Sequence, residues 1–172
     1  MVKARVGIVM GSDSDLPVMK GAADILKQFG IGYEVVISSA HRAPDKTAQY
    51  AKSAEERGLE VIIAGAGMAA HLPGVIAAFT TLPVIGVPLQ SEALAGTDAL
   101  YAIVQMPPGI PVATMAVNGA KNAGIFAAQI LATKDPKIRA KLKAYKQQLA
   151  DEVNAKADRL ERLGVDGYLS NK

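Results

Sequence analysis

The strongest constraint on the fold is the regular alternation of short apolar segments with amphipathic ones along the chain. The short segments are rich in β-branched residues, which favour buried strands. Strands that alternate with helices form a parallel sheet with helices on both of its faces. The five predicted strands cover residues 5–10, 33–37, 60–64, 83–87 and 112–115.

Helical spacing of apolar residues and stop signals at Gly30 and Gly58 define the intervening helices. They run over residues 17–29, about 45–57, a short stretch after 74, 121–133, and about 136–163. We therefore expect an α/β fold with a three-layer open parallel sheet, flavodoxin-like or Rossmann-like, and a long C-terminal helix. Residues 1–163 are expected to form one domain that includes this helix, and residues 164–172 a flexible tail.

Composition excludes several classes of protein. The chain has no cysteine and only two histidines, so neither disulfides nor a metal site with the usual ligand spacing is expected. No apolar run is long enough to span a membrane, and the chain leads directly into a strand, so no signal peptide is expected. A net charge of +3 is too small to indicate nucleic-acid binding. These features favour a cytoplasmic protein.

Charge is distributed unevenly. Between Val61 and Thr133 the only formally charged residues are Glu92, Asp98 and Lys121. Interface cores are depleted in charge, so this segment predicts a homo-oligomer. The basic residues of the last helix are interpreted as a solvated face, although that helix could equally pack on a neighbouring subunit.

Polar residues follow the second predicted strand at the point where it ends. His41 and Arg42 lie between this strand and Pro44, which suits the first turn of a helix. Ligands bind at this edge of open parallel sheets. A histidine there can move a proton near neutral pH, and an arginine can hold an anion. The alternative is a structural loop histidine beside a solvated arginine.

The loop after the first strand, residues 11–15, precedes a helix N-terminus, which favours phosphate binding. Ser12 and Ser14 add hydroxyl donors there. Asp15 would repel phosphate and is better suited to accept hydrogen bonds from sugar hydroxyls. The alternative is that Ser14 or Asp15 only caps the helix.

The loop after the third strand, residues 65–74, contains His71 and matches the G-x-G-x-x-G/A dinucleotide pattern. The match is discounted because it follows the third strand, Pro73 interrupts the helix, and no acidic residue ends the next strand. A nicotinamide-dinucleotide-binding protein stays an alternative. The glycines are instead expected to let the backbone approach a flat ligand.

Five motifs occur together and in order. They are residues 11–15, 39–42, 65–67 with 69–74, 83–88, and 103–107. Between about Arg5 and Thr133 the chain thereby resembles the N5-carboxyaminoimidazole ribonucleotide mutases of purine biosynthesis, the class I PurE family. Met68 departs from the glycine usual at that position, and Leu16 from the frequent tryptophan.

The resemblance implies an isomerase that needs no cofactor and acts on a ribonucleotide. The substrate carboxylate leaves the exocyclic nitrogen as carbon dioxide and adds to ring carbon 4, with His41 as the proton shuttle. Phosphate is assigned to Ser12 and Arg42 and ribose to Asp15. The full set of implied substrate-binding residues is Ser12, Asp15, Ser39, Arg42, Gly67, Ala70, His71 and Leu72.

Three alternatives stay open at this point. A second branch of the family carboxylates aminoimidazole ribonucleotide directly with carbon dioxide, but Arg42 and residues 70–73 resemble the mutase branch. A nicotinamide-dependent protein and a non-enzymatic nucleotide-binding module are the others. The resemblance also implies an octamer in which the C-terminal helix reaches a neighbour.

Overall fold

The computed structural model describes residues 3–170. The chain divides into two compact units, one ending at Leu131 and the other beginning at Ala132. The first unit holds the sheet and the second holds one long helix.

The first unit is built on a single five-stranded parallel sheet. Its strands are β1 (Val6–Met10), β2 (Tyr33–Ile37), β3 (Val61–Gly67), β4 (Val84–Leu89) and β5 (Ala113–Thr114). Their order across the sheet is β2-β1-β3-β4-β5, which is the order of flavodoxin-like folds. The predicted parallel α/β sheet is confirmed. Every residue of β1 and β4 is buried, which explains why these strands are apolar throughout.

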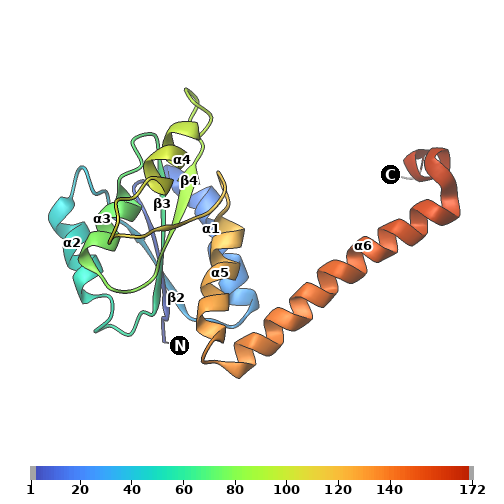
Figure 1. Ribbon diagram of the computed structural model, residues 1–172, viewed down its shortest axis with the longest axis horizontal. Helices are drawn as coiled ribbons and strands as arrows, with labels where there is room; N and C mark the ends of the chain where they lie inside the picture. Colours follow the sequence, from blue (N-terminus) through green and yellow to red (C-terminus); the bar gives the residue numbers. More distant parts are fainter. Residues whose placement is uncertain (1–2, 171–172) are drawn as a thin grey trace. The chain divides into compact units, whose positions relative to one another are not determined.

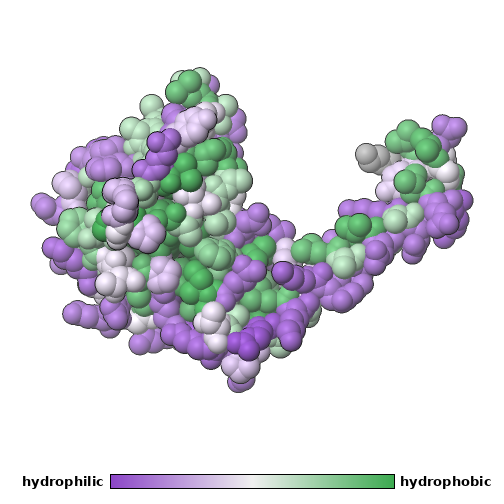
Figure 2. Space-filling model, viewed as in Figure 1, coloured by the Kyte–Doolittle hydropathy of each residue, from purple (hydrophilic) through white to green (hydrophobic). Residues whose placement is uncertain are grey.

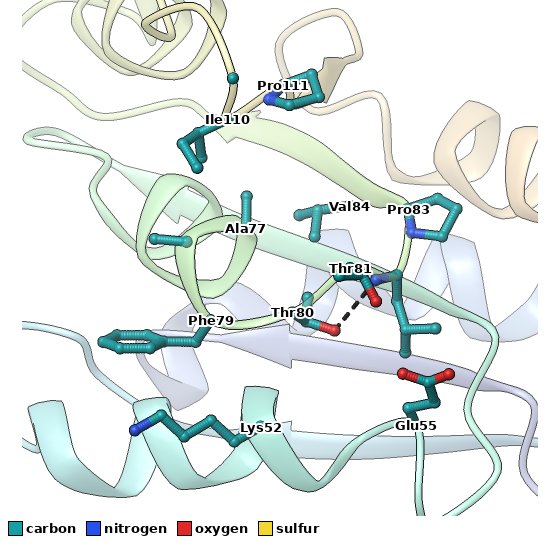
Figure 3. A pocket seen from close by; sticks show the side chains of 13 residues that line it. Lys52, Glu55, Ala77, Phe79, Thr80, Thr81, Pro83, Val84, Ile110 and Pro111 are labelled. Atoms are coloured by element: carbon teal, nitrogen blue, oxygen red, sulfur yellow. Dashed lines mark hydrogen bonds between the residues drawn. The ribbon is translucent and has the colours of Figure 1, made fainter.

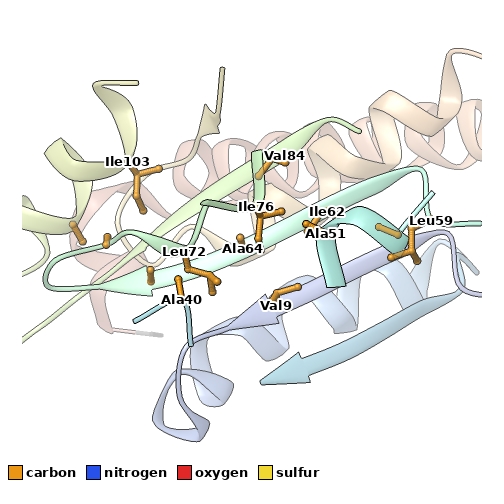
Figure 4. Close-up of a cluster of buried hydrophobic side chains, with 14 residues drawn as sticks. Val9, Ala40, Ala51, Leu59, Ile62, Ala64, Leu72, Ile76, Val84 and Ile103 are labelled. Atoms are coloured by element: carbon orange, nitrogen blue, oxygen red, sulfur yellow. The ribbon is translucent and has the colours of Figure 1, made fainter. Parts of the chain in front are cut away.

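Five helices and one short 3₁₀ turn complete this unit, and the helices cover both faces of the sheet (Figure 1). One face is covered by helices that follow β2, β3 and β4, and their buried side chains share one hydrophobic cluster with the strands (Figure 4). α1 and α5 lie on the other face, where Gly124 of α5 closely approaches Ala22 of α1. The elements are the turn η1 (Asp13–Asp15) and the helices α1 (Leu16–Gln28), α2 (Pro44–Ser53), α3 (Leu72–Phe79), α4 (Thr97–Val104) and α5 (Ala120–Ala132).

Several element boundaries differ from those indicated by the sequence. Residues 65–67, predicted as loop, belong to β3, because their pairing with β4 continues to Gly67 opposite Leu89. β5 keeps only two residues of the predicted four. α2 ends at Ser53, where the Ser53 hydroxyl donates back to the carbonyl of Gln49 at 2.9 Å.

Gly65 allows close packing between β3 and α1. A Cβ atom at this position would collide with the sulfur of Met19 in α1. The absence of a side chain therefore lets α1 pack closely on the sheet, and Gly65 is not among the residues that line the cavity described below. The sequence pattern did not indicate this packing role, because it does not tell which face of the strand a residue occupies.

The second unit contains α6 (Pro136–Ser170). Asp135 caps its start by accepting hydrogen bonds from the amides of Lys137 (3.1 Å) and Ile138 (3.3 Å). The helical conformation is interrupted at Gly164 (φ 65°), directly after the predicted helix end near residue 163, and a second short helical stretch follows this kink. The predicted flexibility of residues 164–172 stays a prediction, and residues 171 and 172 lie outside the described range.

α6 carries exposed apolar side chains along its length, visible as green patches among purple ones in Figure 2. Leu149, Val153 and Leu160 are 43%, 63% and 44% exposed. Their spacing of four and seven residues places them on one side of the helix. α6 therefore presents an apolar stripe on an otherwise polar helix.

Candidate functional site

The loops that follow β1, β2 and β3 meet at the carboxyl end of the sheet around a cavity of about 940 Å³. This edge is where open parallel sheets bind ligands. Eight of the nine residues that the sequence singles out line this cavity. They are Ser12, Asp15, Ser39, His41, Arg42, Gly67, His71 and Leu72.

The loop after β1 is held by reciprocal hydrogen bonds between Ser12 and the residues that follow it. Ser14 N–H donates to Ser12 Oγ at 3.3 Å, and Ser12 N–H donates to Asp15 Oδ2 at 3.1 Å. This is a capping box, which satisfies amides that would otherwise lack partners. Asp15 therefore has a structural role and also lies on the cavity wall.

Burial raises the pKa of the Asp15 carboxyl, and the nearby charge of Asp13 adds to the rise. Backbone hydrogen bonds from Ser12 and Gly11 act in the opposite direction but are weaker. A carboxylate that has lost part of its hydration gains more from new hydrogen-bond donors than one in open water. Asp15 is thus suited to accept hydrogen bonds from the hydroxyl groups of a ligand.

The loop after β2 is held by a buried hydrogen bond to α2 and by hydrogen bonds from Arg42. The hydroxyls of Ser38 and Thr47 share a hydrogen bond of 2.8 Å, and both residues are fully or almost fully buried. The Arg42 guanidinium donates to Ser39 Oγ at 3.4 Å and to the carbonyl of Gly11 at 3.1 Å. Arg42 thereby joins the loops after β1 and β2 and leaves further N–H donors of its guanidinium available beside the cavity.

The two histidines of the chain stack on each other at the cavity wall. The ring of His41, after β2, stacks on the ring of His71, which immediately precedes α3, with centroids 4.9 Å apart and planes inclined by 19°. Both residues are solvent-exposed on the cavity wall. Stacked rings touch through their faces, so the nitrogens at the ring edges stay accessible to a ligand.

The loop after β3 has an unusual backbone conformation at Met68. Its φ is 53°, in the left-handed region that disfavours side chains, and the residue is 65% exposed on the cavity rim. Glycine is the residue that adopts this conformation without strain. The departure from glycine noted in the sequence therefore falls at a position where it strains the backbone.

Ala70 is the one singled-out residue that does not line the cavity. It is 4% exposed, and its methyl group packs in the hydrophobic cluster beneath α3. It lines a separate apolar hollow of about 300 Å³ on the other side of His71. The proposed contact between Ala70 and substrate stays a prediction, although Ala70 is not among the residues that line this cavity.

The sequence analysis missed one wall of the cavity. The last residue of β4, Leu89, and the segment that follows it form this wall, residues 89–93, which includes Gln90, Ser91 and Glu92. The fourth predicted strand ends at the same edge of the sheet as the first three. This rule was a sufficient signal for a ligand-facing segment directly after the fourth strand.

A second cavity of about 850 Å³ lies at the opposite end of β4, beside Val84 (Figure 3). Lys52 and Phe79 meet on its wall, with the ammonium 5.0 Å from the ring centre. Thr80 Oγ1 accepts a hydrogen bond from the amide of Leu82 at 3.2 Å. Neither histidine lines this cavity, so it does not combine the chemical groups found at the carboxyl edge.

Within residues 3–170, no three or more His, Cys, Asp or Glu side chains gather closely enough to hold a metal ion. No helix in the same range combines the length and the apolar character that crossing a membrane requires.

Comparison with known proteins gives consistent matches. The model of the AIR carboxylase family matches residues 5–152. The chain is 63% identical over 168 residues to N5-carboxyaminoimidazole ribonucleotide mutase of Thermotoga maritima, with 98% of each chain covered. It is 61% identical over 168 residues to the mutase of Pyrococcus horikoshii, covering 98% of this chain and 95% of that one. A crystal structure of Treponema denticola PurE matches with a TM-score of 0.81 and 32% identity, over 90% of this chain and 97% of that one.

Proposed function

The chain belongs to the AIR carboxylase family, and we propose that it converts N5-carboxyaminoimidazole ribonucleotide to 4-carboxyaminoimidazole ribonucleotide in purine biosynthesis. The reaction moves a carboxylate within one molecule, so the enzyme is an isomerase. The observation that carries the proposal at the level of chemistry is the stacked pair His41–His71, on a cavity wall shared with Ser12, Asp15 and Arg42.

The reaction needs one proton to move in each direction. The exocyclic nitrogen gains a proton as its bond to the carboxylate breaks and carbon dioxide leaves. Ring carbon 4 then bonds to carbon dioxide and loses its proton. One histidine can perform both transfers in turn, because it titrates near neutral pH. His41 is assigned this role, and its loop position beside the cavity supports it.

The remaining groups suit a ribonucleotide. Ser12 and Arg42 offer hydroxyl and guanidinium donors to the phosphate, and Arg42 already bridges the two loops that would surround it. The partly desolvated Asp15 is assigned to the ribose hydroxyls. The proposed contacts are completed by Ser39, Gly67, Ala70 and Leu72, and His71 supports His41.

Direct carboxylation of aminoimidazole ribonucleotide is the second candidate, because the family description names that activity. Dinucleotide binding is less favoured. The fingerprint match at Gly65–Gly67 lies within β3, and Gly65 is occupied by packing against Met19. The fingerprint requires these glycines at the turn between a strand and a helix.

We also propose that the chain forms a homo-oligomer, specifically an octamer, that α6 contacts a neighbouring copy, and that the protein acts in the cytoplasm. The charge-poor segment 61–133 and the exposed apolar stripe of α6 support association. The absence of cysteine from the sequence agrees with a reducing compartment.

The test is to supply N5-carboxyaminoimidazole ribonucleotide labelled with ¹³C in its carboxylate, in buffer containing unlabelled bicarbonate. The mutase reaction gives product that carries the label, at a rate independent of bicarbonate. A direct carboxylase gives product only when aminoimidazole ribonucleotide and carbon dioxide are supplied, and this product is unlabelled. Turnover in neither assay, together with a thermal shift caused by NAD, would favour the dinucleotide alternative.

A further inference from the structure

The wall of the cavity formed by residues 89–93 is hydrogen-bonded to Asn118, which lies in the turn after β5 and outside the cavity. The amide of Gln90 donates to Asn118 Oδ1 at 3.0 Å, and Asn118 Nδ2 donates to Gln90 Oε1 at 3.2 Å. The backbone amide of Asn118 donates to the carbonyl of Pro88 at 2.8 Å. One asparagine thus makes three hydrogen bonds to the chain directly before and within the wall.

The backbone of Asn118 is adapted to this arrangement. Its φ is 58°, and the amide of Gly119 closes a turn on the carbonyl of Ala116 at 2.9 Å. A turn with positive φ at its third residue favours glycine or asparagine. Glycine would satisfy the backbone alone, whereas asparagine also supplies the two side-chain hydrogen bonds to Gln90.

The same turn, residues 116–119, also packs against Gly96, which lies at the far end of the segment that begins at Gln90. A Cβ atom on Gly96 would lie 2.6 Å from Val117 Cγ1 and 3.2 Å from Gln90 Cα. The segment that begins at Gln90 therefore returns to its own base at Gly96, beside the turn that holds Asn118. Both ends of the segment depend on this turn for their position.

We propose that Asn118 is a positioning residue for the ligand cavity, acting through Gln90 on the wall formed by residues 89–93. The proposal rests on the proposed function only for the identity of the ligand. We call the three hydrogen bonds that join Asn118 to Pro88 and Gln90 the clasp. The clasp does not depend on which ligand is bound.

The experiment uses the full chain and three variants. Asn118→Gly keeps the positive φ accessible and removes both side-chain hydrogen bonds. Asn118→Asp keeps the acceptor for the Gln90 amide and removes the donor, so it serves as the conservative variant. Lys27→Gly, in the last turn of α1, is the matched control for lost stability without a change at the clasp.

Two quantities are measured: hydrogen exchange at the Gln90 amide in the free protein, and the Kd for aminoimidazole ribonucleotide. In Asn118→Gly we expect faster exchange at Gln90 and binding weakened on the order of 10-fold, the effect of losing about two hydrogen bonds. Asn118→Asp should lie between this variant and the wild type. Lys27→Gly should keep both values while it lowers the melting temperature.

Unchanged exchange at Gln90 in Asn118→Gly would overturn the clasp. Faster exchange with an unchanged Kd would overturn the positioning role alone. A wild-type protein that does not bind aminoimidazole ribonucleotide would refute the proposed function, and with it the role of Asn118 toward that ligand, irrespective of the exchange result.

Discussion

His41 and His71 stack with their ring centroids 4.9 Å apart, although 29 residues separate them in the sequence. The contact joins the loop after β2 to the residue that precedes α3, so it depends on the placement of two strands, β2 and β3, on either side of β1. This stack fixes the plane of the His41 ring, and a catalytic histidine must be held in a defined orientation to exchange protons with both a nitrogen and a carbon of the ligand.

The role of His71 can be separated from that of His41 with two variants. His71→Phe keeps a flat ring for stacking but has no titratable nitrogen, whereas His71→Asn removes the ring. We expect His71→Phe to retain more turnover than His71→Asn, because the proposed role of His71 is to orient His41 through ring stacking. Steady-state kinetics of both variants tests this. A His71→Phe protein as inactive as His41→Asn would assign proton transfer to His71.

Asp15 gives a prediction that depends on pH. Burial raises its pKa above the ordinary value of 3.8, so its charged form destabilises the folded state at neutral pH. Asp15→Asn keeps an acceptor for the Ser12 amide and carries no charge. We expect its melting temperature at pH 7 to equal or exceed that of the wild type, and the difference to shrink as the pH falls through the raised pKa.

Ligand affinity should respond to Asp15 in the opposite direction. Loss of a charged acceptor for ribose hydroxyls costs about 1–3 kcal/mol of binding free energy. Asp15→Asn should therefore bind aminoimidazole ribonucleotide more weakly in spite of its stability. Calorimetric titration beside a melting curve measures both properties. A variant that melts early at pH 7 and binds normally would reduce Asp15 to its capping role.

Met68 offers a test of stored backbone strain. Met68→Ala removes the side chain and keeps the unfavourable φ of 53°, whereas Met68→Gly also relieves the strain. We expect the glycine variant to be more stable than the alanine variant by about 1 kcal/mol, the usual preference for glycine in this conformation. Denaturant unfolding of the pair measures the difference. Greater stability of the alanine variant would show that position 68 is unstrained.

The stripe on α6 leads to a prediction about assembly. Val153→Glu places a charge on the exposed apolar side, and Ala144→Glu places the same charge on the opposite side of the helix. Light scattering should give a smaller particle for Val153→Glu only, because a buried unpaired charge opposes association. A wild-type protein that stays monomeric at micromolar concentration would contradict the proposed oligomer.

The order of elements and the edge of the sheet that carries the site follow from local patterns, and these could be predicted from the sequence. Pro44 and Gly30 mark helix ends, and polar residues after apolar strands mark the ligand edge. Such signals are contained in short windows of the chain, and the physical effects behind them are equally local.

Other features depend on contacts between distant residues and were missed. Position 65 requires a glycine because Met19 packs directly against it. The methyl group of Ala70 packs into the hydrophobic cluster and away from the cavity. Gln90 lines the cavity in a position that Asn118 fixes from 28 residues away. None of these relationships leaves a periodic signal in its own segment, so only the assembled sheet reveals them.

The central claim is that His41 carries the proton in both halves of the reaction. The most direct measurement is the turnover of His41→Asn with N5-carboxyaminoimidazole ribonucleotide, together with its Kd for aminoimidazole ribonucleotide. Asparagine keeps a polar tip of similar size but cannot exchange a proton. Turnover should fall by about 10⁴-fold or more, the upper range for loss of a general acid–base group, while the Kd changes little because Ser12 and Arg42 are intact. Normal turnover in His41→Asn would contradict the mechanism.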